Sequence, residues 1–206
     1  MASVAFNNLA RRLDDIEQLI KAHTALTQFQ RAERAAKQTG RELEKILEVV
    51  ESLVTAPGRG RRAEVEALNR AAIVLLSAHL QGYIEDLFNE SAEILLSNKV
   101  RDITALIEQN RSGFSNPHAY RIDRLFASIG MPEITAGLSW RNASNKSIKN
   151  RLTRYVELRN GIAHGRQEMI WKAKVLSFKQ FVEVFAKHFD QRVSDELHAT
   201  LKKAPW

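Results

Sequence analysis

An arginine and a histidine five positions apart are the residues of this chain best suited to phosphate chemistry. They lie in the stretch LRNGIAHG, which runs from residue 158 to residue 165. His164 can take up and release protons near neutral pH, because a free imidazole has a pKa of about 6.5. Arg159 is a permanent planar cation whose fork matches phosphate oxygens, and Asn160 can donate a hydrogen bond to a phosphate or orient the imidazole. The stretch therefore offers one proton-transfer group and one clamp for a negatively charged oxygen, which suits RNA cleavage without a metal.

Each of these residues also has a purely structural interpretation. His164 could be a helix-terminal histidine that is hydrogen-bonded to free carbonyl groups. Arg159 could be the surface ion-pair partner of Glu157 or Glu168, and an Asn-Gly dipeptide is common in turns. Spacing alone leaves these interpretations open beside the catalytic one.

The basic surplus of the chain lies around the same stretch. The 206 residues include 31 Lys and Arg against 24 Asp and Glu, a net charge of +7. Residues 141–174 carry nine basic and two acidic residues, so this window holds a surplus equal to that of the whole chain. A dense positive surface attracts polyanions, which makes RNA a plausible partner, although many proteins carry a basic face that binds nothing. The candidate RNA-binding residues are Lys146, Lys149, Arg151, Arg154, Arg166, Lys172 and Lys174.

Apolar residues recur at spacings of three and four along almost the whole chain, which predicts an all-α fold. The longest pattern, residues 61–97, is apolar on nearly every side in its middle, so this helix should be central. Ser144 or Asn145 is suited to cap the start of a helix at about residue 147, and a loop is expected from Gly161 to Gly165. The remaining expected helices span residues 9–39, 118–129 and 177–201, the last with a Phe stripe typical of a core or a dimer surface.

A Pro- and Gly-containing break at residues 56–60 predicts two parts. Residues 1–55 should form an N-terminal helical arm or hairpin, and residues 61–206 the main helical domain. An apolar stripe at residues 43–54 is long enough to pack on the body or on a second chain.

Several functional classes are excluded by composition and spacing. The chain has no cysteine, so disulfides, thiolate nucleophiles and Cys-based zinc sites are ruled out. No HExxH motif occurs and the other histidines lack partners at ligand spacing, so no metal and no cofactor are expected. His79 falls on an apolar helix, where it is a core histidine or lines a cleft. The most apolar stretch, of about ten residues, is too short to cross a membrane, and no secretory signal is present, which predicts a cytoplasmic protein.

The LRNGIAHG stretch and the helix at residues 70–87 together resemble the HEPN superfamily, in particular its RiboL-PSP branch, over roughly residues 61–200. The resemblance implies a HEPN-like helical bundle and a homodimeric cleft in which Arg159, Asn160 and His164 cleave RNA. It also implies 2′,3′-cyclic phosphate and 5′-hydroxyl ends, a toxin or defence role, and an antitoxin or other regulatory protein as a possible partner. Gln81 departs from the pattern, since many relatives carry a glutamate near this position.

The sequence therefore allows three functions. The first is a metal-independent endoribonuclease. The second is a non-catalytic HEPN-like module that binds RNA or a protein. The third is a structural helical dimerisation protein that binds no polyanion.

Overall fold

The described part of the chain is built from helices. The computed structural model describes residues 2–39, 61–96, 105, 108–109, 111–141 and 143–206. Among these residues no strand forms beyond one isolated antiparallel bridge between Trp140 and Ala143, which confirms the all-α prediction. The helices are α1 (Val4–Thr39), α3 (Arg61–Leu96), α5 (Ala119–Ala127), α6 (Asn145–Ala163) and α7 (Lys172–Leu201).

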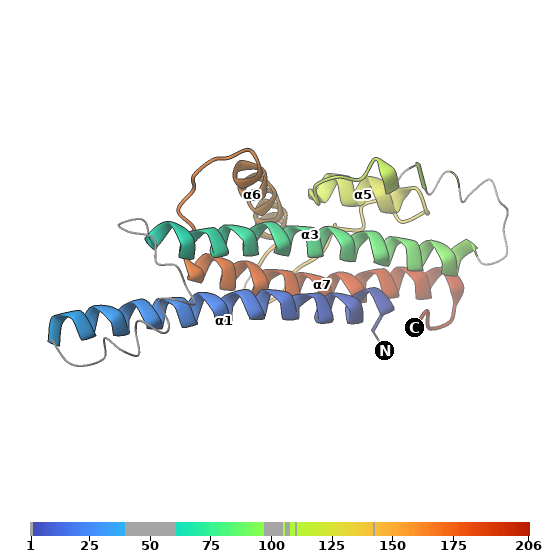
Figure 1. Cartoon of the computed structure of the whole chain (residues 1–206). Helices are drawn as coiled ribbons and strands as arrows, with labels where there is room; N and C mark the ends of the chain where they lie inside the picture. The colour runs from blue at the N-terminus through green and yellow to red at the C-terminus, as the bar shows by residue number, and fades with distance from the viewer. Residues whose placement is uncertain (1, 40–60, 97–104, 106–107, 110, 142) are drawn as a thin grey trace.

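The long helices α1, α3 and α7 lie side by side (Figure 1), and α3 contacts both of the others. Helix α1 runs antiparallel to α3 and α7, while α5 and α6 lie above α3 in Figure 1. Helix α3 contacts each of the other four helices, so it is covered on several sides, as its apolar middle predicted. Its observed start is the predicted one and its end differs by one residue. None of the described helices is long and apolar enough to cross a membrane.

Helix α1 packs into the same core as the rest of the bundle. Leu9, Leu13 and Ile16 are buried against it, as their helical spacing predicted. The N-terminus of α1 is fixed by polar contacts: the Ser3 hydroxyl accepts from the N–H of Phe6 at 3.0 Å and donates to Asp190 of α7. The apolar stripe at 43–54 and the break at 56–60 lie outside the described residues, so the division into arm and main domain stays a prediction.

Helix α7 carries the aromatic stripe of the core. Phe178, Phe181, Phe185 and Phe189 are buried, and the ring of Phe185 stacks on those of Phe181 and Phe189 at 5.9 and 5.3 Å. The helix begins at Lys172, five residues before the predicted start. Its beginning is set by tertiary structure, because the Asn69 amide on α3 donates to the carbonyl of Ile170 at 2.8 Å and returns the chain to the bundle there.

Candidate functional site

The LRNGIAHG stretch forms the last turns of α6 and the residues that stop it. Ser144 is the N-cap of this helix, since its hydroxyl accepts from the N–H of Ser147 at 3.4 Å. The helix continues to Ala163, so the prediction of a loop from Gly161 was wrong at its beginning. Gly161 is buried, and a Cβ there would lie 3.1 Å from Oε1 of Glu168. The glycine therefore leaves room for the side chains of Glu168 and Arg166 against this turn of the helix.

Helix α6 ends in a Schellman motif, in which the chain reverses through a left-handed residue. The N–H of Arg166 donates to the carbonyl of Gly161 at 2.9 Å, and the N–H of Gly165 donates to that of Ile162 at 3.0 Å. Gly165 has φ +79°, and His164 is the C-cap residue. The motif consequently places His164 at the point where the chain leaves the helix.

Arg159 is half-buried and held by two amide oxygens. Its Nη1 donates to Oδ1 of Asn160 at 2.9 Å and to Oδ1 of Asn116 at 3.1 Å. No ion pair of Arg159 occurs within the described residues, so the interpretation as a partner of Glu157 or Glu168 is not supported. The guanidinium is thus oriented by neutral groups, which leave its charge uncompensated by a carboxylate in this part of the chain.

The imidazole of His164 is exposed. Its backbone N–H donates to the carbonyl of Asn160 at 2.9 Å, but its side chain makes no hydrogen bond to the carbonyls at the helix end among the described residues. Five positions correspond to about 7.5 Å along an ideal helix axis. Arg159 and His164 make no hydrogen bond with each other among the described residues.

A loop before α5 adds residues that the sequence did not single out. Asn116, the partner of Arg159, has φ +58°, and its carbonyl accepts from the N–H of His118 at 2.8 Å. The ring of His118 stacks on that of Tyr120 at 5.6 Å. Burial and then the charge of Arg121 lower the pKa of His118, whereas Glu157 of α6 opposes them. The only local signal was a Ser-Asn-Pro turn, which does not indicate contact with a residue 43 positions away.

The predicted RNA-binding residues are spread along α6 and beyond it. Arg151 lies over the Phe181 ring at 4.6 Å, and it lines a hollow together with Lys146 and Arg154. A neighbouring hollow adds Arg141 and Trp140. This basic group lies in the N-terminal half of α6, whereas the motif ends the helix. At 1.5 Å per residue the separation along the axis is about 7.5 Å from Arg154 to Arg159 and about 27 Å from Lys146 to His164.

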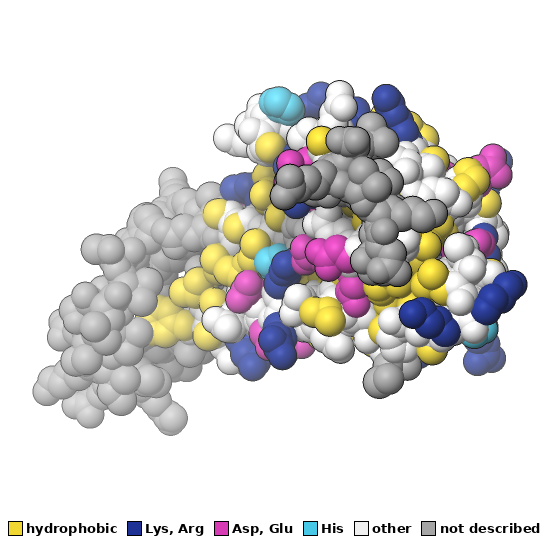
Figure 2. Space-filling view, turned by 90° about the vertical axis from the view of Figure 1, so that its right-hand side faces the viewer, with side chains coloured by type: hydrophobic (Ala, Val, Ile, Leu, Met, Phe, Trp, Pro, Cys, Tyr) yellow, Lys and Arg dark blue, Asp and Glu magenta, His cyan; other side chains and the backbone are white. Residues whose placement is uncertain are grey.

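The other predicted basic residues have separate surroundings. Lys149 pairs with Asp123 of α5 at 3.8 Å, and Lys172 donates to the Thr24 hydroxyl of α1 at 2.7 Å. Arg166 is exposed in the segment after α6, and Lys174 is exposed with its ammonium 5.9 Å from the centroid of the Tyr155 ring. On the face shown in Figure 2, basic and acidic side chains are interspersed. Lys149 and Lys172 therefore have partners outside the motif, on α5 and α1.

His79 lies in the interface between α3 and α1 rather than beside the motif. Its side chain is 11% exposed, and its Nε2 lies 3.6 Å from Oδ2 of Asp15. Burial lowers the pKa of this histidine; Asp15 opposes the shift and Arg12 adds to it. Gln81, the position that departs from the family pattern, donates from its amide to Glu85 of the same helix at 2.9 Å.

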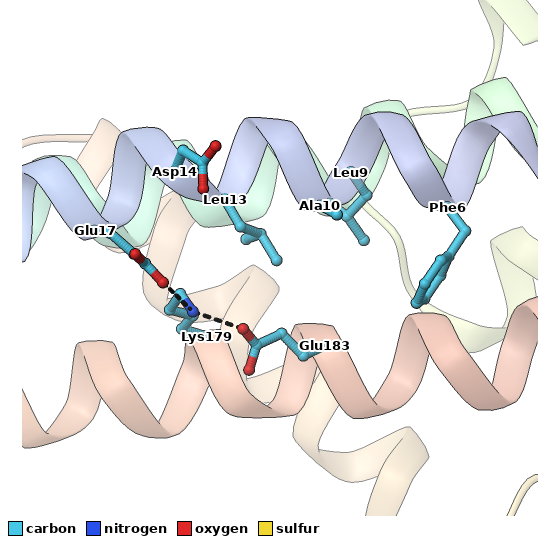
Figure 3. A pocket seen from close by; sticks show the side chains of 8 residues that line it. All are labelled: Phe6, Leu9, Ala10, Leu13, Asp14, Glu17, Lys179 and Glu183. Carbon is cyan, nitrogen blue, oxygen red and sulfur yellow. Dashed lines mark hydrogen bonds and ion pairs between the residues drawn. The ribbon is translucent and has the colours of Figure 1, made fainter.

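A groove between α1 and α7 contains no motif residue (Figure 3). Lys179 of α7 closes one end of it, 3.2 Å from Glu17 and 2.6 Å from Glu183. Burial lowers the pKa of Lys179, but its hydrogen bonds to the two glutamates outweigh burial and raise it. The groove thus lies between two packed helices that are joined by the ion pair of Lys179 with Glu17. Among the described residues no group of three or more His, Asp or Glu side chains is placed to hold a metal ion.

Comparison with known proteins places this architecture in a family. The family model described as RiboL-PSP-HEPN matches residues 37–195, which is most of the chain and begins earlier than the resemblance at residue 61. No curated protein and no solved structure matches the chain significantly. The chain therefore belongs to the RiboL-PSP-HEPN family, and its HEPN domain indicates an RNase-like or otherwise RNA-related function.

Proposed function

We propose that this protein is a metal-independent endoribonuclease whose reacting groups lie at the end of α6. The observation that carries the proposal is the presence of two suitable groups at this helix end. Arg159 is oriented by amide oxygens and has no ion-paired carboxylate among the described residues, and the imidazole of His164 is exposed. An ion-paired carboxylate would weaken a cation that must bind phosphate, and among the described residues no carboxylate lies within ion-pair distance of Arg159.

In the proposed reaction the ribose 2′-oxygen attacks the adjacent phosphorus while the bond from phosphorus to the 5′-oxygen breaks. A base takes the proton of the 2′-hydroxyl, and an acid gives a proton to the departing 5′-oxygen. The products carry a 2′,3′-cyclic phosphate and a 5′-hydroxyl. An imidazole suits both proton transfers because it changes charge near neutral pH.

Arg159 and Asn160 are proposed to stabilise the phosphorane. The guanidinium offsets the charge that develops on the non-bridging oxygens. Asn160 already accepts from Arg159 through Oδ1, so its amide nitrogen is the group that can donate to a phosphate oxygen. The basic hollow lined by Lys146, Arg151 and Arg154 would hold the RNA backbone further along α6.

A homodimer is proposed because one chain supplies a single motif histidine, whereas the reaction uses both a base and an acid. Two copies related by a two-fold axis would place two imidazoles and two guanidinium groups around one phosphate. One imidazole could then act as the base and the other as the acid. Within this proposal the protein acts in a toxin or defence setting, held in check by an antitoxin or another regulatory protein.

The test is a cleavage assay with mapped ends in EDTA. We expect cleavage by the wild type, a loss of about 10²–10⁴-fold in His164→Ala and of about 10²–10³-fold in Arg159→Ala. His198→Ala and Arg11→Ala, which remove exposed residues of the same types on α7 and α1, should cleave like the wild type. Activity abolished by EDTA, or retained in both motif variants, contradicts the proposal. Salt-dependent RNA binding without cleavage would instead support the non-catalytic module.

A further inference from the structure

An exposed aromatic ring stands at the start of α5, close to the motif. Tyr120 is 63% exposed although its ring is large and mostly apolar. One face of it stacks on His118, with centroids 5.6 Å apart and an angle of 21° between the ring planes. The guanidinium of Arg121 lies 5.7 Å from the Tyr120 centroid. The ring is therefore supported by a second ring and accompanied by a cation, while much of its surface faces solvent.

Hydrogen bonds hold this group of side chains in place. Nε of Arg121 donates to the Tyr120 hydroxyl at 2.9 Å. Nη1 of the same arginine donates to the carbonyl and the hydroxyl of Ser115, at 2.9 and 2.7 Å. A ring that is already ordered loses little side-chain entropy when a ligand stacks on it, so the arrangement favours binding.

The group is linked to the proposed catalytic arginine through Asn116 of the loop before α5. Asn116, whose side chain accepts from Arg159, lies two positions before His118, so their Cα atoms are at most about 7 Å apart. Tyr120 and Arg121 also line an open hollow of about 780 Å³ together with Arg124 and Phe114. The described residues that line this hollow include two arginines and no acidic side chain. An aromatic ring beside arginines is the combination that proteins use to stack bases and hold the phosphates between them.

We infer that Tyr120, backed by His118 and flanked by Arg121, is the stacking platform for an unpaired base of single-stranded RNA next to the phosphate held by Arg159. The inference rests on the proposed function and adds to it the substrate class, RNA with an unpaired base beside the cleaved bond. The lowered pKa of His118 favours a neutral imidazole at pH 7, which stacks without adding charge. Stacking accepts every base, so the platform selects single strands rather than a sequence.

The experiment measures binding apart from cleavage. Full-length His164→Ala protein is titrated into a fluorescently labelled single-stranded RNA of about eight nucleotides, and into an abasic oligonucleotide of the same length and charge. Tyr120→Ala, Tyr120→Leu and Tyr120→Phe are compared in the same background. Leu keeps apolar bulk without a π system, and Phe keeps the ring without the hydroxyl. Circular dichroism checks that each variant is folded, which is expected because the side chain is exposed.

We expect Tyr120→Ala and Tyr120→Leu to bind the RNA about 5- to 150-fold more weakly, the range that base stacking gives on loss of an aromatic ring. Tyr120→Phe should bind within about twofold of its parent, and all variants should bind the abasic strand equally. The inference is overturned if Tyr120→Ala binds RNA like its parent, if the abasic strand binds as tightly as RNA, or if the parent binds no RNA because this surface serves a protein. If the wild type cleaves RNA but binding does not depend on Tyr120, only the stacking inference is contradicted. If binding depends on Tyr120 but the wild type does not cleave RNA, only the proposed nuclease function is contradicted.

Discussion

Replacing Gly165 by alanine should destabilise the end of α6 through the backbone alone. Gly165 has φ +79°, in the left-handed region, and a Cβ placed on it would meet nothing within 4 Å. Steric contact with the rest of the protein is therefore not the reason for glycine at this position. The reason is the conflict between a Cβ and its own backbone at positive φ, which is about 1–2 kcal/mol for an L-residue.

The expected loss is consequently about 0.5–1.5 kcal/mol in the free energy of unfolding, because alanine also lowers the conformational entropy of the unfolded chain and so offsets part of the strain. For a chain of this size such a loss lowers the melting temperature by about 1–6 °C. If the chain instead relieves the strain by leaving the left-handed region, the two hydrogen bonds that close the Schellman motif break. His164 is the C-cap of that motif, so its position would change together with them.

The assay is chemical denaturation of the wild type, Gly165→Ala and Gly165→Asn, with cleavage measured well below the melting temperature. Asparagine tolerates the left-handed region better than alanine, so Gly165→Asn should lose less stability. Under the proposed function, Gly165→Ala should also cleave more slowly than its folded fraction explains. Equal stability of Gly165→Ala and the wild type would refute the reasoning, because it would mean that the left-handed geometry does not end α6.

Two further predictions concern the anchoring of α1. The Glu90 carboxylate accepts from the N–H groups of Val4 and Ala5 at 3.1 Å each. Because the N-terminus of a helix favours a negative charge, Glu90→Gln should lower the free energy of unfolding by about 1–2 kcal/mol. The control Glu93→Gln, at an exposed position of the same helix as Glu90, should change it by less than about 0.5 kcal/mol. Burial raises the pKa of Asp190 above its ordinary value of 3.8 and Glu90 adds to the shift, while the bonds from Ser3 and the N-terminal amine oppose it. The stabilisation that protonated Asp190 gives to the fold is therefore full below pH 3.8 and is lost as the pH rises through the raised pKa of Asp190. Urea denaturation from below pH 3.8 upward should show that the free energy of unfolding falls less with pH in Asp190→Asn than in the wild type. An identical pH dependence of the two proteins would contradict the raised pKa.

Most of the fold could be predicted because its elements are defined by local periodicity. The apolar spacing in α3 produced bounds within one residue of those observed, and the stripe of α1 faces the core as predicted. Helix ends were less predictable where distant residues set them. Gly161 was expected in a loop, but the helix continues past it to Ala163 and is closed by the N–H groups of Gly165 and Arg166. Helix α7 begins early because Asn69, 101 positions away, binds the chain just before it.

The sequence by itself determined the all-α fold and the family, and it identified Arg159, Asn160 and His164 as the candidate reacting residues. Only the tertiary structure decided what those residues touch. Arg159 is oriented by Asn116 from a loop 43 positions earlier, and Lys172, counted with the basic window, donates to α1, 148 positions away. The physical reason is that helical period and charge are properties of neighbouring positions. A hydrogen bond between distant segments depends on how the helices pack, and no spacing in the sequence records that packing.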